Sequence, residues 1–266
     1  MRPRLNSLWV GERLGWIEEL CVRSAIANDH PFTIYSYTPE TLLGVPPSVE
    51  VRDAREVMPE TALIRYADSN AVQLGSDIFR YHLMTKSLGY WTDLDCLILK
   101  PLDFSEDHVF GFERHDSINS AILKIPSDSK MLDIIFKFIT TKRCPPWWGP
   151  KRTLMYYGSK LLRGSVAIEE LPWGTVGPEL VTHAAKMSGC TRFAQSQSVF
   201  YPVGYGDVSI LLNNAQDVRS HIEHVDTKAV HLYRSALIRL LHGGRAPDHS
   251  YLTEACRLLG VVATEV

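Results

Sequence analysis

Two acidic residues lie two positions apart in the segment YWTDLDCLILK, residues 90–100. Asp93 and Asp95 precede a short apolar run, where a buried strand is expected. Carboxylates are costly to remove from water without a partner, so this arrangement predicts a compensating group nearby. At the carboxyl end of a strand in an open α/β sheet, two hard oxygen ligands suit a divalent cation that bridges substrate phosphates. Two solvated acids in a surface turn are the simpler explanation of the triplet considered alone.

The helix expected just before this pair carries two more charged candidates. Asp77 and Arg80 are three residues apart, so they share one helix face, and that face leads toward the acid pair. An ordinary surface ion pair at this spacing, which contributes only about 0.2–0.5 kcal/mol, explains them as well.

Helices and strands are expected to alternate along the chain, which is typical of an α/β fold. Strands are predicted at residues 7–10, 32–37, 90–93, 108–113, 119–126, 198–203 and 228–233. Helices are predicted at residues 12–27, 71–88 with Asn70 as the cap, 129–141, after residue 178, and 249–259. Residues 144–151, CPPWWGPK, are expected to form a loop. We expect residues 1–266 to form one domain, with a nucleotide-binding sheet, flanking helices and irregular C-terminal additions.

Composition narrows the classes of function. A net charge of −2 without a basic stripe argues against a nucleic-acid partner. The chain has no run of about 18 apolar residues, so no transmembrane segment is expected. Five scattered cysteines without a C-x-x-C pair predict neither a disulfide framework nor a structural zinc site. These features favour a cytoplasmic protein.

The whole segment SDIFRYHLMTKSLGYWTDLDCLILKPL, residues 76–102, resembles the sugar-binding region of DXD glycosyltransferases. It is most similar to glycosyltransferase family 32, and more distantly to the catalytic domain of the clostridial glucosylating toxins. Those proteins have a Ser-Asp-x-x-Arg helix, a Gly-Gly-x-Tyr-like turn and then Asp-x-Asp. Here Ser87-Leu88-Gly89-Tyr90 departs from the double-glycine form of the turn.

The resemblance implies a GT-A fold and a metal-dependent transferase. The reaction would move a hexose from a UDP-sugar to a glycan or lipid-linked sugar acceptor, with retention of the anomeric configuration. It implies Mn²⁺ or Mg²⁺ as the cofactor and a place in bacterial surface polysaccharide or lipopolysaccharide synthesis. Peripheral association with the inner face of the bacterial membrane is expected with it.

The resemblance also implies roles for individual residues. Asp93, Asp95 and His231 would bind the metal, and Asp77, Arg80, Asp93 and Asp95 would form the catalytic group. The donor would contact Trp9, which would stack on uracil, together with Asp77, Arg80, Tyr90, Asp93, Asn119, Gly177, Pro178, His231 and Arg234. Each has a plainer interpretation: Trp9 as a core aromatic, Asn119 as a turn cap, Pro178 as the first helical residue, and His231 as a satisfied core histidine.

Other functions stay open at this stage. A haloacid-dehalogenase-like phosphohydrolase also carries Asp-x-Asp after a strand, but its motif needs four apolar residues before the first acid, where this chain has GYWT. A non-catalytic sugar-nucleotide-binding module would not need both acids. Trp147 and Trp148 are expected to stack on an acceptor sugar, with anchoring of their loop as the alternative.

Overall fold

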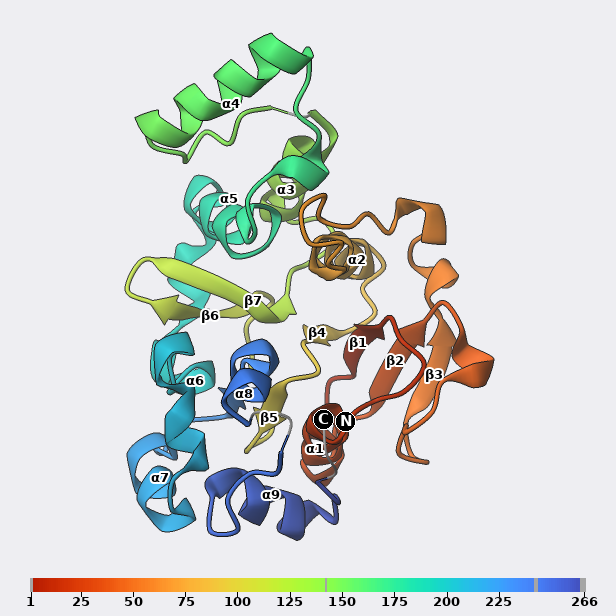
Figure 1. Ribbon diagram of the computed structural model, residues 1–266, viewed down its shortest axis with the longest axis vertical. Helices are drawn as coiled ribbons and strands as arrows, with labels where there is room; N and C mark the ends of the chain where they lie inside the picture. The colour runs from red at the N-terminus through yellow and green to blue at the C-terminus, as the bar shows by residue number, and fades with distance from the viewer. Residues whose placement is uncertain (1, 142, 242–243, 264–266) are drawn as a thin grey trace.

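Strands and helices alternate along the part of the chain that the structure describes and build an α/β fold (Figure 1). This computed structural model describes residues 2–141, 143–241 and 244–263. The strands are β1 (Leu5–Trp9), β2 (Phe32–Ser36), β3 (Glu50–Asp53), β4 (Tyr90–Thr92), β5 (Cys96–Ile98), β6 (Val109–Arg114), β7 (Ser117–Lys124), β8 (Ala194–Gln195) and β9 (Ala229–His231). The α-helices are α1 (Trp16–Ala27), α2 (Gln73–Thr85), α3 (Lys130–Thr141), α4 (Pro150–Arg163), α5 (Leu180–Ser188), α6 (Gln197–Phe200), α7 (Ala215–Ile222), α8 (Arg234–Leu241) and α9 (Tyr251–Leu259).

Seven of the described strands form one mixed sheet in the order β3-β2-β1-β4-β7-β6-β8. The strands β3, β2, β1 and β4 are parallel, whereas β7 runs antiparallel to both β4 and β6. All five residues of β2 are buried, as expected for a parallel strand covered on both faces. This mixed sheet with flanking helices is consistent with a GT-A-like nucleotide-binding fold.

Two buried polar side chains hold β1 in register with β4. The Asn6 amide donates hydrogen bonds of 3.0 Å to the carbonyls of Leu88 and Tyr90, and the Ser7 hydroxyl donates to the carbonyl of Thr92. Because the two strands are parallel, their carboxyl ends meet at the same edge of the sheet. Trp9 ends β1 at this edge, and Asp93 follows the last residue of β4.

The C-terminal additions contain more regular structure than the sequence predicts. In Figure 1, α7, α8 and α9 lie in the lower part of the molecule, where β5 also lies; β5 pairs antiparallel with β9 as a two-stranded ribbon. The apolar side chains of these helices form a core cluster with α1, in which Leu20, Leu237 and Leu252 are fully buried. This cluster fixes the ribbon against the rest of the molecule.

The strand predicted at residues 198–203 is wrong. Residues Gln197–Phe200 form the short helix α6, which buries Val199 and Phe200. Pro202 lacks the N–H that a sheet ladder needs, so the apolar run ends in a turn instead.

Two helix boundaries also differ from prediction. Asn70 does not cap the helix before the acid pair, because α2 begins at Gln73 after Val72, and Asn70 has a φ of 55°. The helix α4 begins inside the predicted loop, where Pro150 occupies its first turn.

The turn from α2 into β4 requires glycine. Gly89 has a φ of 116°, and a Cβ at this position would lie 2.5 Å from the Arg4 carbonyl oxygen. The glycine therefore lets α2 end close to β1 and sets the start of β4.

None of the helices in the described ranges combines the length and the apolar character that a membrane crossing needs.

Candidate functional site

Asp93 and Asp95 belong to a turn between β4 and β5 and not to a strand. The strand β4 ends at Thr92, and β5 begins at Cys96. Neither acid is a strand residue, and each carboxylate has a different partner. The Asp93 carboxylate is held by Arg80 and Trp91, which precede it in the motif, whereas that of Asp95 is held by residues from β9 and α8.

The Asp93 carboxylate forms an ion pair with the guanidinium of Arg80. Its Oδ1 is 3.1 Å from Arg80 Nη2 and accepts a hydrogen bond of 2.6 Å from the Trp91 indole. The Arg80 guanidinium also lies over the Trp91 ring, 4.8 Å from its centroid. Burial raises the pKa of Asp93, which the charge of Arg80 opposes.

Arg80 is a buried arginine with several partners. Its Nη1 donates to both the carbonyl and the hydroxyl of Ser120, each at 2.7 Å, and its Nη2 lies 3.2 Å from Asp77 Oδ1. Its Nε is buried and has no hydrogen-bond partner among the described residues. The predicted pair of Asp77 and Arg80 is therefore not the solvated surface pair of the plainer interpretation, because both side chains are about nine-tenths buried.

Asp77 is enclosed by the backbone of Gly177. A short π-helix spans Thr175–Glu179 and is kinked at Gly177, where ψ is −112°. A Cβ at this glycine would lie 2.7 Å from Asp77 Oδ2. Burial raises the pKa of Asp77 to about 6, with Arg80 opposing the rise and Asp93 adding to it.

The ribbon of β5 and β9 joins Asp95 to His231. Cys96 stands opposite His231 in this antiparallel pair, so the residue before Cys96 and the residues after His231 are also close. His231 Nε2 lies 3.1 Å from Asp95 Oδ1, and the backbone N–H of Arg234 donates to Asp95 Oδ2 at 2.9 Å. The two residues are 136 positions apart in the sequence.

The charges of this pair shift both pKa values. Burial alone disfavours a charged imidazole, but the charge of Asp95 and its hydrogen bond outweigh burial and raise the pKa of His231. Burial opposes the ionisation of Asp95, yet His231 and the Arg234 N–H lower the pKa of that carboxyl. Both shifts favour the charged forms, so the two side chains form an ion pair.

Donor atoms for a metal gather at Asp95, Cys96 and His231. One ligand atom from each lies within 4.8 Å of the others. Burial and the nearby acids raise the pKa of the Cys96 thiol well above its usual value, which opposes formation of a thiolate ligand. Asp93 lies outside this group of three, because its Oδ1 contacts Arg80 and Trp91.

The remaining atoms of this group fit a divalent cation. His231 Nδ1 is buried without a hydrogen-bond partner in the described residues, so no hydrogen bond there competes with a ligand at this nitrogen. A carboxylate with an imidazole suits a first-row divalent metal better than Mg²⁺, which prefers oxygen ligands alone. Asp95 and His231 could therefore hold Mn²⁺, with Asp93 on the adjacent side of the turn.

Trp9, Asn119 and Tyr90 were also predicted to contact the donor, and each lies on a strand of the sheet. Trp9 ends β1 at the same sheet edge, and its indole N–H is buried without a partner among the described residues. Asn119 precedes Ser120 within β7 and accepts a local hydrogen bond from the Ala121 N–H at 2.8 Å, so it is a strand residue and not a turn cap. Tyr90 packs in a core cluster with the Lys124 ammonium over its ring.

Two further predictions concern the edges of this region. Pro178 follows the kink at Gly177, and its carbonyl accepts a hydrogen bond from the Thr182 hydroxyl at 2.7 Å. The Arg234 side chain forms an ion pair with the fully buried Glu18 and is partly exposed. Its backbone N–H, and not its guanidinium, contacts the acid pair.

Sequence reasoning missed several residues that support the site. Ser120 and Trp91 orient Arg80 and Asp93, and only the position of Trp91 inside the motif could have pointed to it. Tyr233 has a φ of 46°, lies 4.0 Å from the His231 ring centroid and donates to Glu113 at 2.7 Å. No local pattern links Glu113 to this tyrosine, because 120 positions separate them.

Trp147 and Trp148 anchor their loop. Both indole N–H groups donate to Glu179 Oε2, at 3.0 and 3.1 Å, while Arg152 contacts the other oxygen of this carboxylate at 2.8 Å. Trp147 also packs against the ring of His183. These contacts favour the anchoring role of the two tryptophans.

A scan against models of known protein families found no match, and a search of curated proteins found no similar sequence. The case for a function therefore rests on the motif residues and their geometry.

Proposed function

We propose that this chain is a metal-dependent glycosyltransferase that moves a hexose from a UDP-sugar to a glycan or lipid-linked sugar acceptor. The observation that carries this proposal is the contact of 3.1 Å between Asp95 and His231, beside the carboxyl edge of the sheet where Asp93 and Arg80 also meet. Open α/β sheets bind ligands at such an edge. The order of the motif, its resemblance to glycosyltransferase family 32 and the mixed sheet all support the same function.

Asp95 and His231 are the residues that would hold Mn²⁺ or Mg²⁺. A bound divalent cation supplies Lewis-acid stabilisation of the negative charge on a departing diphosphate. Asp95 would offer its carboxylate oxygens, although each already accepts one hydrogen bond. Asp93 would contact the ribose and the water shell of the cation, since Arg80 and Trp91 fix its carboxylate next to the ligand pair.

Arg80 would orient the donor from the floor of the site. Its position is fixed by Ser120 on one side and by two carboxylates on the other. A guanidinium held in this way keeps its charge, and only its Nε–H has no partner among the described residues. Gly177 lets the turn pack directly against the Asp77 carboxylate, where any side chain would clash.

Retention of the anomeric configuration is part of the proposal. We favour an internal return, in which the acceptor attacks from the side that the diphosphate leaves. The carboxylates of Asp77 and Asp93 are both engaged by Arg80, which makes either a weak nucleophile in a double displacement. We place the reaction in bacterial surface polysaccharide or lipopolysaccharide synthesis.

A panel of nucleotide sugars tests the proposal by measuring the release of nucleotide with Mn²⁺, Mg²⁺ or no metal. We expect metal-dependent release of UDP from at least one donor. Asp95→Asn should lower the rate by roughly a hundredfold to ten-thousandfold, because it removes a charged ligand while keeping size and hydrogen bonding. Asp93→Asn should keep weak metal-dependent activity. Asp107→Asn is the matched control, since that side chain is 87% exposed and lies on another turn.

The alternatives give different results in the same experiment. Hydrolysis of a generic phosphate ester without UDP release would identify a phosphohydrolase. Metal-dependent UDP binding without turnover of any donor or acceptor would identify a binding module. Wild-type, metal-stimulated UDP release by Asp95→Asn would contradict the metal site.

A further inference from the structure

The helix α4 lies at the outer end of the molecule, beyond α3 and α5 and opposite α7 and α9 (Figure 1). It has fourteen residues, all of them described, and Tyr156 is its one buried side chain. Five apolar side chains of this helix are between 53% and 87% exposed: Leu154, Met155, Tyr157, Leu161 and Leu162. A helix that packs on a protein normally buries such residues.

The exposed apolar residues form one continuous face. At 100° per residue, their five positions span less than half of the helix circumference. The opposite side carries Tyr156 together with Arg152 and Arg163, which pair with Glu179 and Glu170 of the protein body. The polar side of α4 thus faces the protein, and the apolar side faces outward.

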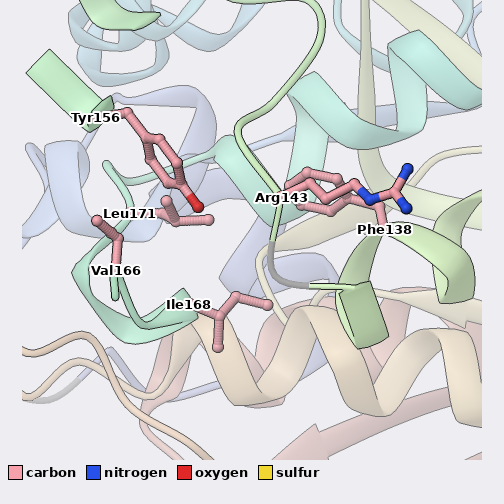
Figure 2. Close-up of a pocket in the computed structure, with 6 residues that line it drawn as sticks. All are labelled: Phe138, Arg143, Tyr156, Val166, Ile168 and Leu171. Atoms are coloured by element: carbon pink, nitrogen blue, oxygen red, sulfur yellow. The ribbon is translucent and has the colours of Figure 1, made fainter. Parts of the chain in front are cut away.

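A pocket beneath the helix confirms which side faces inward. Figure 2 shows Tyr156 pointing toward Leu171 and Val166, with Ile168 and Phe138 also in the wall. The pocket is small: its volume of about 10 Å³ is close to the least that holds one water molecule. Because Tyr156 is committed to this wall, α4 cannot turn its apolar face inward without losing that contact and both ion pairs.

The charge of α4 has one sign. Its sequence, PKRTLMYYGSKLLR, contains four basic residues and no acidic one. Lys151 and Lys160 are exposed and form no ion pair with any residue in the described ranges. An outward apolar face with free cations beside it complements an apolar layer covered by anionic groups.

We propose that α4 binds the surface of an anionic lipid bilayer and lies in the plane of its headgroups. The leucines of the outward face enter the boundary of the acyl chains, while Lys151 and Lys160 contact lipid phosphates. This surface does not depend on the reaction proposed above, because α4 contributes none of the residues around Asp93 and Asp95. A second protein or a second copy of the chain would not need cations beside the apolar face.

Sedimentation of the full chain with lipid vesicles tests this surface. One set of vesicles contains phosphatidylcholine with phosphatidylglycerol, and the other contains phosphatidylcholine alone. We expect binding to the anionic set, weaker binding at high salt, and little binding to the neutral set. Leu161→Glu with Leu162→Glu should weaken binding about tenfold or more, since both side chains enter the bilayer.

Two further variants separate charge from apolar contact. Lys151→Gln with Lys160→Gln should weaken binding to anionic vesicles by roughly 20- to 30-fold, which corresponds to about 1 kcal/mol for each cation. Met187→Glu with Leu258→Glu is the matched control, because these exposed residues belong to α5 and α9, and its binding should match wild type. All variants change exposed side chains, so circular dichroism should show the wild-type fold.

Three results would overturn the proposal. The first is that wild-type protein stays in solution when anionic vesicles are sedimented. The second is that the variant with Leu161→Glu and Leu162→Glu binds these vesicles as well as wild type does. A wild-type dimer in light scattering that this variant dissociates would assign the face to a second copy of the chain.

Discussion

Asp77 shows how burial sets the chemistry of one residue in this site. Its carboxylate is enclosed by the helix that carries it and by the Gly177 backbone, so it loses most of its contact with water. Arg80 compensates only in part, because the same guanidinium also serves Asp93. Burial therefore outweighs the ion pair and raises the pKa of Asp77 to about 6.

This shift predicts a pH-dependent stability. The pKa of Asp77 rises from about 4 in the unfolded chain to about 6 in the fold, so the folded state binds the proton more tightly. The resulting stability is present below about pH 4 and is lost as the pH rises through about 6. The loss should approach about 3 kcal/mol, an order-of-magnitude value from the two-unit shift.

Asp77→Asn should remove this dependence, because the amide does not titrate. We expect the free energy of unfolding of wild type, relative to Asp77→Asn, to fall between about pH 4 and pH 7. Chemical denaturation over this range measures the difference, with Asp107→Asn as the control variant. A difference that does not change with pH would show that Asp77 has an ordinary pKa.

At the scale of the element, the kinked π-helix Thr175–Glu179 brings a backbone atom, and not a side chain, against Asp77. Any residue larger than glycine at position 177 would place its Cβ within 3 Å of the carboxylate. The same kink lets the Tyr81 hydroxyl donate to the Val176 carbonyl at 2.7 Å, which ties the turn to α2. The element therefore joins α2 to the region where the donor sugar is proposed to lie.

Gly177→Ala should destabilise the protein by about 1–3 kcal/mol, the usual cost of forcing a group into a packed site. It should also lower the rate of UDP release, because the turn or Asp77 must move. Gly158→Ala is the matched control, since nothing lies within 4 Å of a Cβ at that helical position. This control should be as stable as wild type or slightly more stable. If Gly177→Ala were as stable as Gly158→Ala, the turn at residue 177 would accept a Cβ without loss of folding free energy.

At the scale of the whole molecule, the site joins three parts of the chain. The parallel half of the sheet provides Trp9 and Asp93, α2 provides Asp77 and Arg80, and the ribbon of β5 and β9 brings His231 to Asp95. A ligand that contacts all three should stabilise the fold as a unit, because binding to the native state alone adds stability by mass action.

UDP and Mn²⁺ together should therefore raise the melting temperature more than the sum of their separate effects. Metal binding requires a neutral imidazole, and the pKa of His231 is raised, so the Mn²⁺ effect should grow as the pH rises above about 6.5, the ordinary value for histidine. Thermal unfolding with each ligand alone and with both measures this coupling.

Trp9→Ala should weaken UDP binding by about 1–3 kcal/mol if the indole stacks on the base, while the Mn²⁺ effect stays. Trp173→Ala is the control, because that side chain is largely exposed and lies outside the site. If the folded Trp9→Ala variant bound UDP with unchanged affinity, Trp9 would be a core aromatic residue that does not stack on the base.

The local part of this structure was predictable from the sequence. The helix, turn and strand around the acid pair follow from apolar periodicity and from Gly89, because these features act between residues close in the chain. The same holds for β1, β2, β7 and α3, whose positions match prediction within a few residues. The sequence pattern gave the wrong element at α6, where a short apolar run suggested a strand. It also missed the helix α4, which begins with a proline inside the predicted loop.

The partners of the candidate residues were decided by the tertiary structure alone. The sequence singled out Asp93, Asp95 and His231, yet only packing directs Asp93 to Arg80 and Asp95 to His231. The contact between Asp95 and His231 depends on the register of β5 with β9, and the enclosure of Asp77 depends on where the turn at Gly177 docks. Such contacts arise from the burial of whole elements, which brings distant segments together and sets the dielectric around each charge. Residue types and spacing therefore determined which groups could act, and the fold determined their charges, their neighbours and the outward face of α4.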